Sequence, residues 1–179
     1  MSTWKIHPDI DHYYCTNTIV EWYPIFTESS LFDVIIESLI HCMDEKGLRL
    51  HAYVIMLNHM HLICSSASKL SVSDIMRDFK RFTSIKISSS FKEKNHQSVL
   101  DVFRRAAQQK GLNQNYKVWQ DGFHPISIHT GSFFRNKLEY IHHNPVRKGY
   151  VLEPQHWFYS SASNYMGNNH TALEIDFLC

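Results

Sequence analysis

The chain has 179 residues, 44% of them hydrophobic, which suits a single domain over residues 1–179 with a packed core. Its four cysteines are widely spaced and form no Cys-x-x-Cys pair, which argues against disulfides and a zinc knuckle. The sequence shows no apolar leader and no run of about 18 apolar residues, so we expect a cytoplasmic protein without a membrane partner. The formal net charge of +1 by itself says little about nucleic-acid binding.

The spacing of apolar residues predicts strands and helices that alternate along the chain. A run rich in Tyr, Thr, Ile and Val predicts a strand at 12–20. Ser29 or Ser30 can cap a helix at 31–46, which Gly47 would end. Further on we expect strands at 48–57 and 59–65, a helix from Ser71 through Arg81 and onward to Phe91, a helix at 97–109, a strand at 124–129, and a helix containing Tyr140. This order predicts an α+β fold with a ferredoxin-like (RRM-like) βαββαβ core and an antiparallel sheet.

Two histidines on one predicted strand form the first candidate site. In the stretch YVIMLNHMHLIC, His59 and His61 alternate with apolar residues, so both rings face the side of the strand opposite to the core. Neutral imidazole nitrogens are among the commonest ligands of divalent metals, so this pair provides half of a metal site. The alternative interpretation is a polar sheet face with two solvated histidines.

The stretch YIHHNPVRKGYV contains the second candidate site. Apolar residues recur at helical spacing from Phe134 to Ile141, which predicts a helix with one face in the core. Tyr140 lies off that face, and Asn144 lies on the same side as Tyr140, one turn later. Because Pro145 disfavours helix at the residue before it, we expect the helix to end at or near Asn144. An interfacial tyrosine followed by a capping asparagine is the alternative.

Positive charge is concentrated in the middle of the chain. Residues 1–76 carry four Lys/Arg and nine Asp/Glu, residues 77–117 carry ten and three, and residues 118–179 carry four and five. Clustered Lys and Arg in an otherwise neutral body are typical of binding to a phosphate backbone, whereas a solvated helix face is the alternative. The candidate DNA-binding residues are Arg77, Lys80, Arg81 and Lys86 in this segment, and Lys137, Arg147 and Lys148 around the tyrosine helix.

Together, the two motifs resemble the single-tyrosine HUH transposases, and most closely the REP-associated tyrosine transposases. His59 and His61 flank one hydrophobic residue, as in the signature of that family, and Tyr140 followed by Asn144 matches its catalytic helix. The segments YYCTNTIVEWYPIF, DFKRFTSIKI, WQDGFHPI and WFYSSASNYMG extend the resemblance over nearly the whole chain. Leu57 departs from the family, in which proline or a small residue often occupies this place, and it should alter the turn without removing a ligand.

The resemblance implies a metal-dependent transposase that cleaves and rejoins single-stranded DNA at a hairpin-marked site. Tyr140 would be the nucleophile, forming a 5′-phosphotyrosine and releasing a 3′-hydroxyl. His59, His61 and Asn144 would hold Mg²⁺ or Mn²⁺, with His142 or His143 as alternative third ligands. Two other functions stay open: a non-catalytic nucleic-acid-binding module on the same fold, and a metal-dependent phosphoesterase that uses water and needs no tyrosine. A homodimer and a monomer also stay open.

Overall fold

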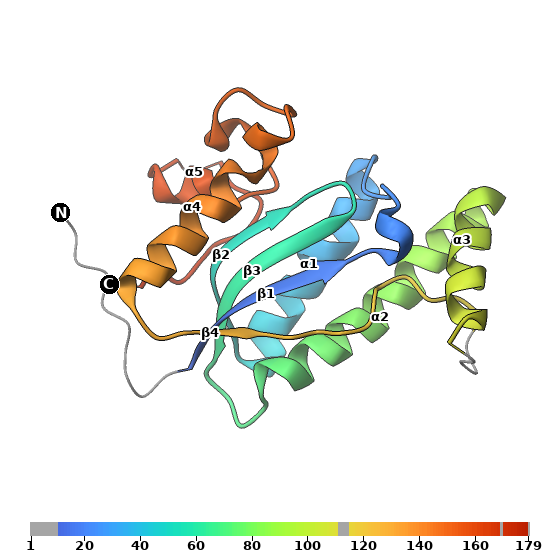
Figure 1. Ribbon diagram of the computed structural model, residues 1–179, viewed down its shortest axis with the longest axis horizontal. Coiled ribbons are helices and arrows are strands. Elements are labelled where there is room, and N and C mark those ends of the chain that lie inside the picture. The colour runs from blue at the N-terminus through green and yellow to red at the C-terminus, as the bar shows by residue number, and fades with distance from the viewer. Residues whose placement is uncertain (1–10, 111–114, 169, 179) are drawn as a thin grey trace.

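The computed structural model describes residues 11–110, 115–168 and 170–178 and contains a four-stranded antiparallel sheet (Figure 1). The strands are β1 (His12–Thr18), β2 (Leu48–Ile55), β3 (His59–Ser66) and β4 (Ile126–Ile128), in the spatial order β2-β3-β1-β4. The helices are α1 (Ser29–Lys46), α2 (Val72–Glu93), α3 (Gln97–Gln108), α4 (Gly131–Arg147) and α5 (Ala162–Tyr165), with short 3-10 turns η1 (Val20–Trp22) and η2 (Pro154–His156). This topology confirms the predicted ferredoxin-like α+β core.

Local sequence signals determine where α1 stops and where α2 starts. The predicted cap of α1 at Ser29 or Ser30 is wrong, because Glu28 is the N-cap and makes no side-chain capping hydrogen bond. Gly47 ends α1 in the left-handed conformation with a φ of 74°, and a Cβ atom there would come within 2.8 Å of the Ser68 side chain. Ser71 begins α2, because its hydroxyl accepts a hydrogen bond from the Asp74 backbone N–H and donates one to the Asp74 carboxylate. Both signals were predicted from the sequence and are confirmed.

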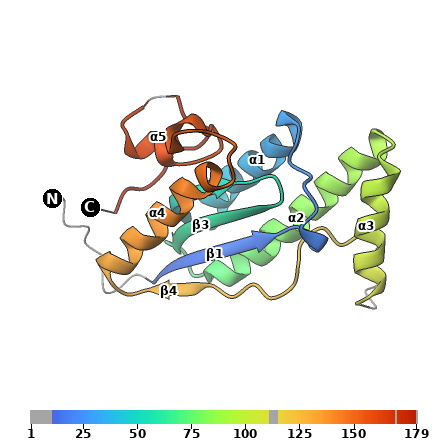
Figure 2. The same ribbon diagram turned by 45° about the horizontal axis from the view of Figure 1, so that its top comes forward.

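Helices cover both faces of the sheet and form two separate cores (Figure 2). Helices α1 and α2 pack on the face where Leu62 of β3 is buried. Helix α4 packs on the other face, where its Phe134 shares a core with Ile63. Because successive side chains on a strand point to opposite faces, His59 and His61 share the α4 face with Ile63, as the alternation predicted.

Two predicted boundaries on the α2 and β4 side differ from the structure. Helix α2 continues past Phe91 to Glu93. Within it the Ser88 hydroxyl donates to the Ser84 carbonyl oxygen at 2.7 Å, so this serine does not interrupt the helix. Strand β4 is shorter than the predicted 124–129, because only β1 pairs with it. Within the described residues, no helix combines the length and apolar character needed to cross a membrane.

The prediction that the tyrosine helix ends at or near Asn144 is wrong. Helix α4 continues through Pro145 to Arg147. Pro145 removes only one N–H donor, and the Lys148 N–H still donates to the Asn144 carbonyl oxygen at 3.1 Å. Asn144 is therefore a residue of the helix body, and it is buried, with 5% of its surface exposed.

Candidate active site

Tyr140 of α4 lies against the two histidines of β3. The ring centroids of Tyr140 and His61 are 5.4 Å apart, and those of His59 and His61 are 4.8 Å apart. Tyr140 nevertheless keeps 43% of its surface exposed. The structure therefore brings together residues that are far apart in sequence, and it leaves the phenol accessible to a substrate.

A chain of hydrogen bonds orients His59. Its Nδ1 lies 2.7 Å from the Asn58 side-chain oxygen, while the Asn58 amide nitrogen donates to the Trp22 carbonyl oxygen at 2.8 Å. The second bond fixes the orientation of the amide, so the Asn58 oxygen accepts from the His59 ring. This bond places the proton of His59 on Nδ1 and leaves the lone pair on Nε2.

His61 has one nitrogen bonded to the sheet and one free. Its Nδ1 lies 2.9 Å from the hydroxyls of both Tyr14 and Thr16 on β1. Its Nε2 is buried and has no hydrogen-bond partner among the described residues. A buried polar atom without a partner is costly, and a bound ion would relieve that cost.

The donor set of these rings fits a divalent metal. Histidine ligands commonly bind through one nitrogen while the other is held by a hydrogen bond, which is the arrangement of both His59 and His61. No group of three or more His, Cys, Asp and Glu side chains that could hold a metal occurs in the part of the chain that the structure describes. A third protein ligand would therefore be of another type, such as the amide of Asn144.

Burial keeps both histidines neutral. It lowers the pKa of His59 from 6.5 to about 4, with a further contribution from the positive charge of Lys148. It lowers the pKa of His61 to about 3, and His59, Lys137 and Arg147 contribute in the same direction. Metals bind the neutral form of imidazole, so the rings stay competent as ligands far below neutral pH.

Lys137 and Arg147 lie on either side of the Tyr140 ring along the helix. The Lys137 ammonium is 5.8 Å from the Tyr140 ring centroid and 4.4 Å from that of Tyr14. The Arg147 guanidinium is 4.5 Å from the Tyr140 ring centroid, and it donates to the Tyr140 carbonyl oxygen at 2.6 Å. These cation–π contacts keep two positive charges beside the phenol ring.

The three candidates for a third ligand differ in their surroundings. Asn144 is buried one helical turn beyond Tyr140, on the same side of α4. His142 is engaged outside the site, because its Nε2 lies 2.9 Å from the Ser161 hydroxyl. His143 is exposed, and its Nδ1 donates to the carbonyl oxygen of the preceding turn. Asn144 is therefore the buried candidate on the Tyr140 side.

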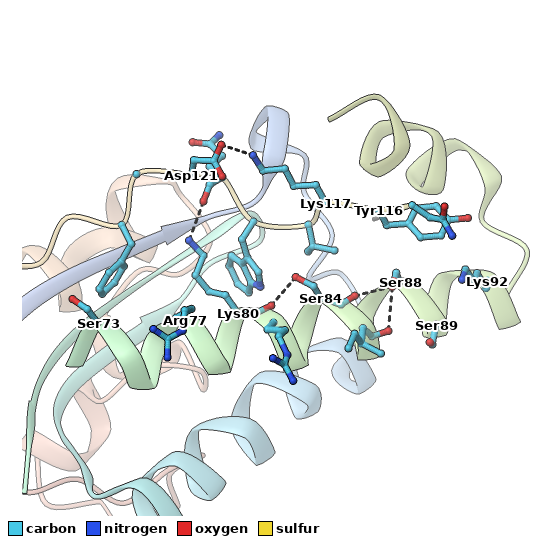
Figure 3. A pocket seen from close by; sticks show the side chains of 18 residues that line it. Ser73, Arg77, Lys80, Ser84, Ser88, Ser89, Lys92, Tyr116, Lys117 and Asp121 are labelled. Carbon is cyan, nitrogen blue, oxygen red and sulfur yellow. Dashed lines mark hydrogen bonds and ion pairs between the residues drawn. The ribbon is translucent and has the colours of Figure 1, made fainter. Parts of the chain in front are cut away.

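The remaining predicted DNA-binding cations lie on the opposite face of the sheet. Arg77, Lys80 and Arg81 line a groove of about 790 Å³ between α2 and residues 115–123 (Figure 3). Lys80 donates to the Gln120 carbonyl oxygen at 2.9 Å, so it also holds this segment in place. Lys86 instead lines a separate groove between α1 and α2. The seven candidate cations thus form one group beside Tyr140 and another on α2.

Sequence reasoning missed the residues that hold the histidines from behind. Tyr14 and Thr16 were visible only as part of a strand, and Asn58 only as a turn. The antiparallel register pairs Thr16 with His61, and this pairing follows from the position of β1 beside β3. The ferredoxin-like order contains that signal, because it places the first and third strands next to each other.

A solved structure with a similar chain supports this fold. The structure of a REP-associated tyrosine transposase bound to a REP hairpin matches with a TM-score of 0.64 and 17% sequence identity, covering 98% of this chain and 93% of that chain. A suspected transposase from Deinococcus radiodurans R1 matches with a TM-score of 0.46 and 14% identity, covering 79% of this chain and 95% of that chain. No curated protein matches at a significant level.

A comparison with protein families identifies the chain more directly. The sequence matches the family described as IS200-like transposase over residues 12–144. This range runs from the first residue of β1 into the last turn of α4, so it includes the two histidines of β3 and Tyr140. The chain therefore belongs to the IS200-like transposase family.

Proposed function

We propose that this transposase cleaves and rejoins single-stranded DNA at a hairpin-marked site, with Tyr140 as the nucleophile. The close approach of Tyr140 to His61, with ring centroids 5.4 Å apart, carries the proposal, because it puts an exposed phenol beside two neutral histidines. The similar solved structure is bound to a REP hairpin, which favours hairpin DNA as the substrate.

The proposed reaction exchanges one phosphodiester for another. The Tyr140 oxygen loses its proton and forms a bond to the scissile phosphorus, while the bond from phosphorus to the 3′ oxygen breaks and that oxygen gains a proton. The products are a 5′-phosphate joined to Tyr140 and a free 3′-hydroxyl. Attack by another 3′-hydroxyl reverses the step, so rejoining needs no nucleotide cofactor.

We propose His59, His61 and Asn144 as the ligands of Mg²⁺ or Mn²⁺, to which mixed imidazole and oxygen donors are suited. When bound, such a cation supplies Lewis-acid polarisation of the scissile phosphate. The protein contributes the orientation of both rings: the bond to Asn58 leaves the Nε2 lone pair of His59 free, and the β1 hydroxyls hold the His61 ring at its Nδ1. Lys137, Arg147 and Lys148 would add positive charge where negative charge develops.

The substitution Tyr140→Phe tests the nucleophile. Hairpin-forming single strands from the flanks of the chain's own gene, labelled at the 3′ end, should give a protein–DNA band that survives denaturation. We expect the variant to lose this band and to bind the same DNA almost unchanged, because only the hydroxyl is removed. An adduct formed by the variant would contradict the assignment of Tyr140.

The same gel separates the alternative functions. A non-catalytic binding module would retain the DNA without cutting it and without an adduct in either protein. A phosphoesterase that uses water would cut the strand with no adduct, and Tyr140→Phe would not stop it.

A further inference from the structure

The turn that follows β1 holds two consecutive residues in a conformation that side chains rarely adopt. Glu21 has a φ of 55° and Trp22 a φ of 54°. This left-handed region is unfavourable for residues other than glycine, and such strain gathers at ligand-binding and catalytic sites. Hydrogen bonds hold the turn in place, with the Trp22 N–H donating to the Ile19 carbonyl oxygen at 3.0 Å.

The strained turn presents the indole of Trp22 to solvent at the edge of the candidate active site. Trp22 is 55% exposed, and its ring centroid is 5.6 Å from that of His59. The other two described tryptophans have their indole N–H bonded within the protein, Trp119 to the Thr83 hydroxyl and Trp157 to a carbonyl oxygen of β2. The exposed part of the Trp22 indole is therefore an apolar surface that faces solvent and does not pack in the core.

Asn58 ties the position of this indole to the proposed metal ligand. Its amide nitrogen bonds to the Trp22 carbonyl oxygen, and its amide oxygen bonds to Nδ1 of His59. One side chain thus holds both the strained backbone and the imidazole. The positive charge of Lys148, which acts on His59, lies on this side of the site as well.

We infer that Trp22 is a stacking platform for an unpaired nucleobase next to the phosphate at Tyr140. The inference rests on the proposed function, since it takes single-stranded DNA as the ligand. Every base has an aromatic face, so an exposed indole binds unpaired bases with little dependence on sequence. A base held on Trp22, beside His59, would position the adjoining phosphate for the phenol.

Binding to a normal and an abasic strand tests this inference. An oligo(dT) strand and an abasic strand of equal length are titrated at low salt, with Tyr140→Phe present in every protein so that no strand is cut. We expect Trp22→Ala to weaken binding of oligo(dT) by about tenfold or more, and Trp22→Phe to retain most of it. On the abasic strand, proteins with Trp22 and with the alanine should bind alike.

Phe158→Ala is the matched control. Phe158 is also an exposed aromatic, at 43%, but the rings on which it packs, Tyr159 and His170, are not residues of the candidate site. Its substitution should leave the binding of both strands unchanged. Thermal unfolding of each variant shows whether the fold is intact.

Two outcomes would overturn the inference: unchanged oligo(dT) binding by Trp22→Ala, or an equal loss on both strands, which would mean a backbone contact or a fold defect. Failure of the proposed chemistry is recognised separately. A chain that forms no adduct, yet binds bases through Trp22, would keep the platform and lose the nucleophile.

Discussion

Residues outside the two motifs determine how the two histidine rings are oriented. They are Asn58, Tyr14 and Thr16. Each of them contacts the Nδ1 atom of an imidazole, so these bonds orient both rings and leave each Nε2 atom free for another partner. Burial adds to this effect by keeping the rings unprotonated. At the residue scale, these contacts would hold the two rings ready for the metal ion that we propose.

A thermal shift experiment tests that preparation without relying on activity. Mn²⁺ should raise the unfolding midpoint of the unaltered protein, because an ion that binds only the folded state stabilises it. His61→Ala and His59→Ala should abolish this shift and should also stop cleavage. The exposed His129 lies just before α4, and His129→Ala should behave like the unaltered protein.

Removal of the metal should give the same result as removal of a ligand. EDTA is expected to stop cleavage by the unaltered protein, and added Mg²⁺ or Mn²⁺ should restore it. Undiminished cleavage in the chelator, together with no Mn²⁺ shift, would show that His59 and His61 have another role.

At the scale of elements, α2 carries a row of charges whose members are not equivalent. The Arg77 side chain is 69% exposed, and among the described residues it pairs with Asp74 and Asp78, two acidic groups of its own helix. Lys80 is instead half-buried and bonded to the Gln120 carbonyl oxygen. A change at Lys80 would therefore disturb the groove itself, whereas Arg77 and Arg81 can be changed with little structural effect.

Salt dependence shows whether DNA binds along α2. If Arg77 and Arg81 bind phosphates, the double variant Arg77→Gln/Arg81→Gln should reduce the slope of log affinity against log salt by about 0.7 for each single-strand phosphate that is no longer neutralised. The exposed residues Arg49 and Lys69 lie away from the groove, and their neutralisation should leave the slope unchanged.

The cations of α4 provide the competing path. The alternative result is that the α2 variant leaves the slope of log affinity against log salt unchanged while Lys137→Gln/Lys148→Gln reduces it. That result would mean that the DNA runs beside Tyr140 alone and that α2 is only a solvated face. A defect in folding would lower the active fraction of protein without changing either slope.

The stability of the whole molecule should depend on pH through four histidines whose pKa is lowered by desolvation. Burial lowers the pKa of His51, His59 and His142 to about 4 and that of His61 to about 3. In the unfolded chain these rings titrate near about 6.5. The unfolded state therefore binds more protons between about pH 6.5 and 4, so the free energy of unfolding is full above that window and falls as the pH drops through it.

Urea unfolding at a series of pH values measures this loss. Each histidine that stays neutral in the folded state should contribute a slope of up to about 1.4 kcal/mol per pH unit. His142→Gln keeps a side-chain donor near the Ser161 hydroxyl and should reduce the slope by about one histidine's share. Ion-paired carboxylates such as Asp78, whose pKa is lowered by Lys46, lose their contribution only at still lower pH. Constant stability from about pH 7 to 4.5 would contradict the assignment of neutral rings.

Much of the fold and the centre of the site could be predicted, because their signals are local. The alternation around His59 and His61, and the helical spacing before Tyr140, each depend on a few neighbouring residues. The partners of the rings could not be predicted in this way, since Tyr14 meets His61 only through the pairing of β1 with β3. The predicted end of α4 was wrong for a related reason. The local rule that Pro145 ends a helix did not hold, because the last turn of α4 continues to Arg147.

The sheet separates the α2 groove from Tyr140, and this separation has a consequence for the length of the DNA. A strand that binds both faces must travel around an edge of the sheet, whereas a strand that only reaches Tyr140 can be short. Trimming an oligonucleotide would then lower its affinity before it lowers the rate at which bound DNA is cut. The shortest strand that is cleaved should thus be shorter than the shortest strand that binds with full affinity.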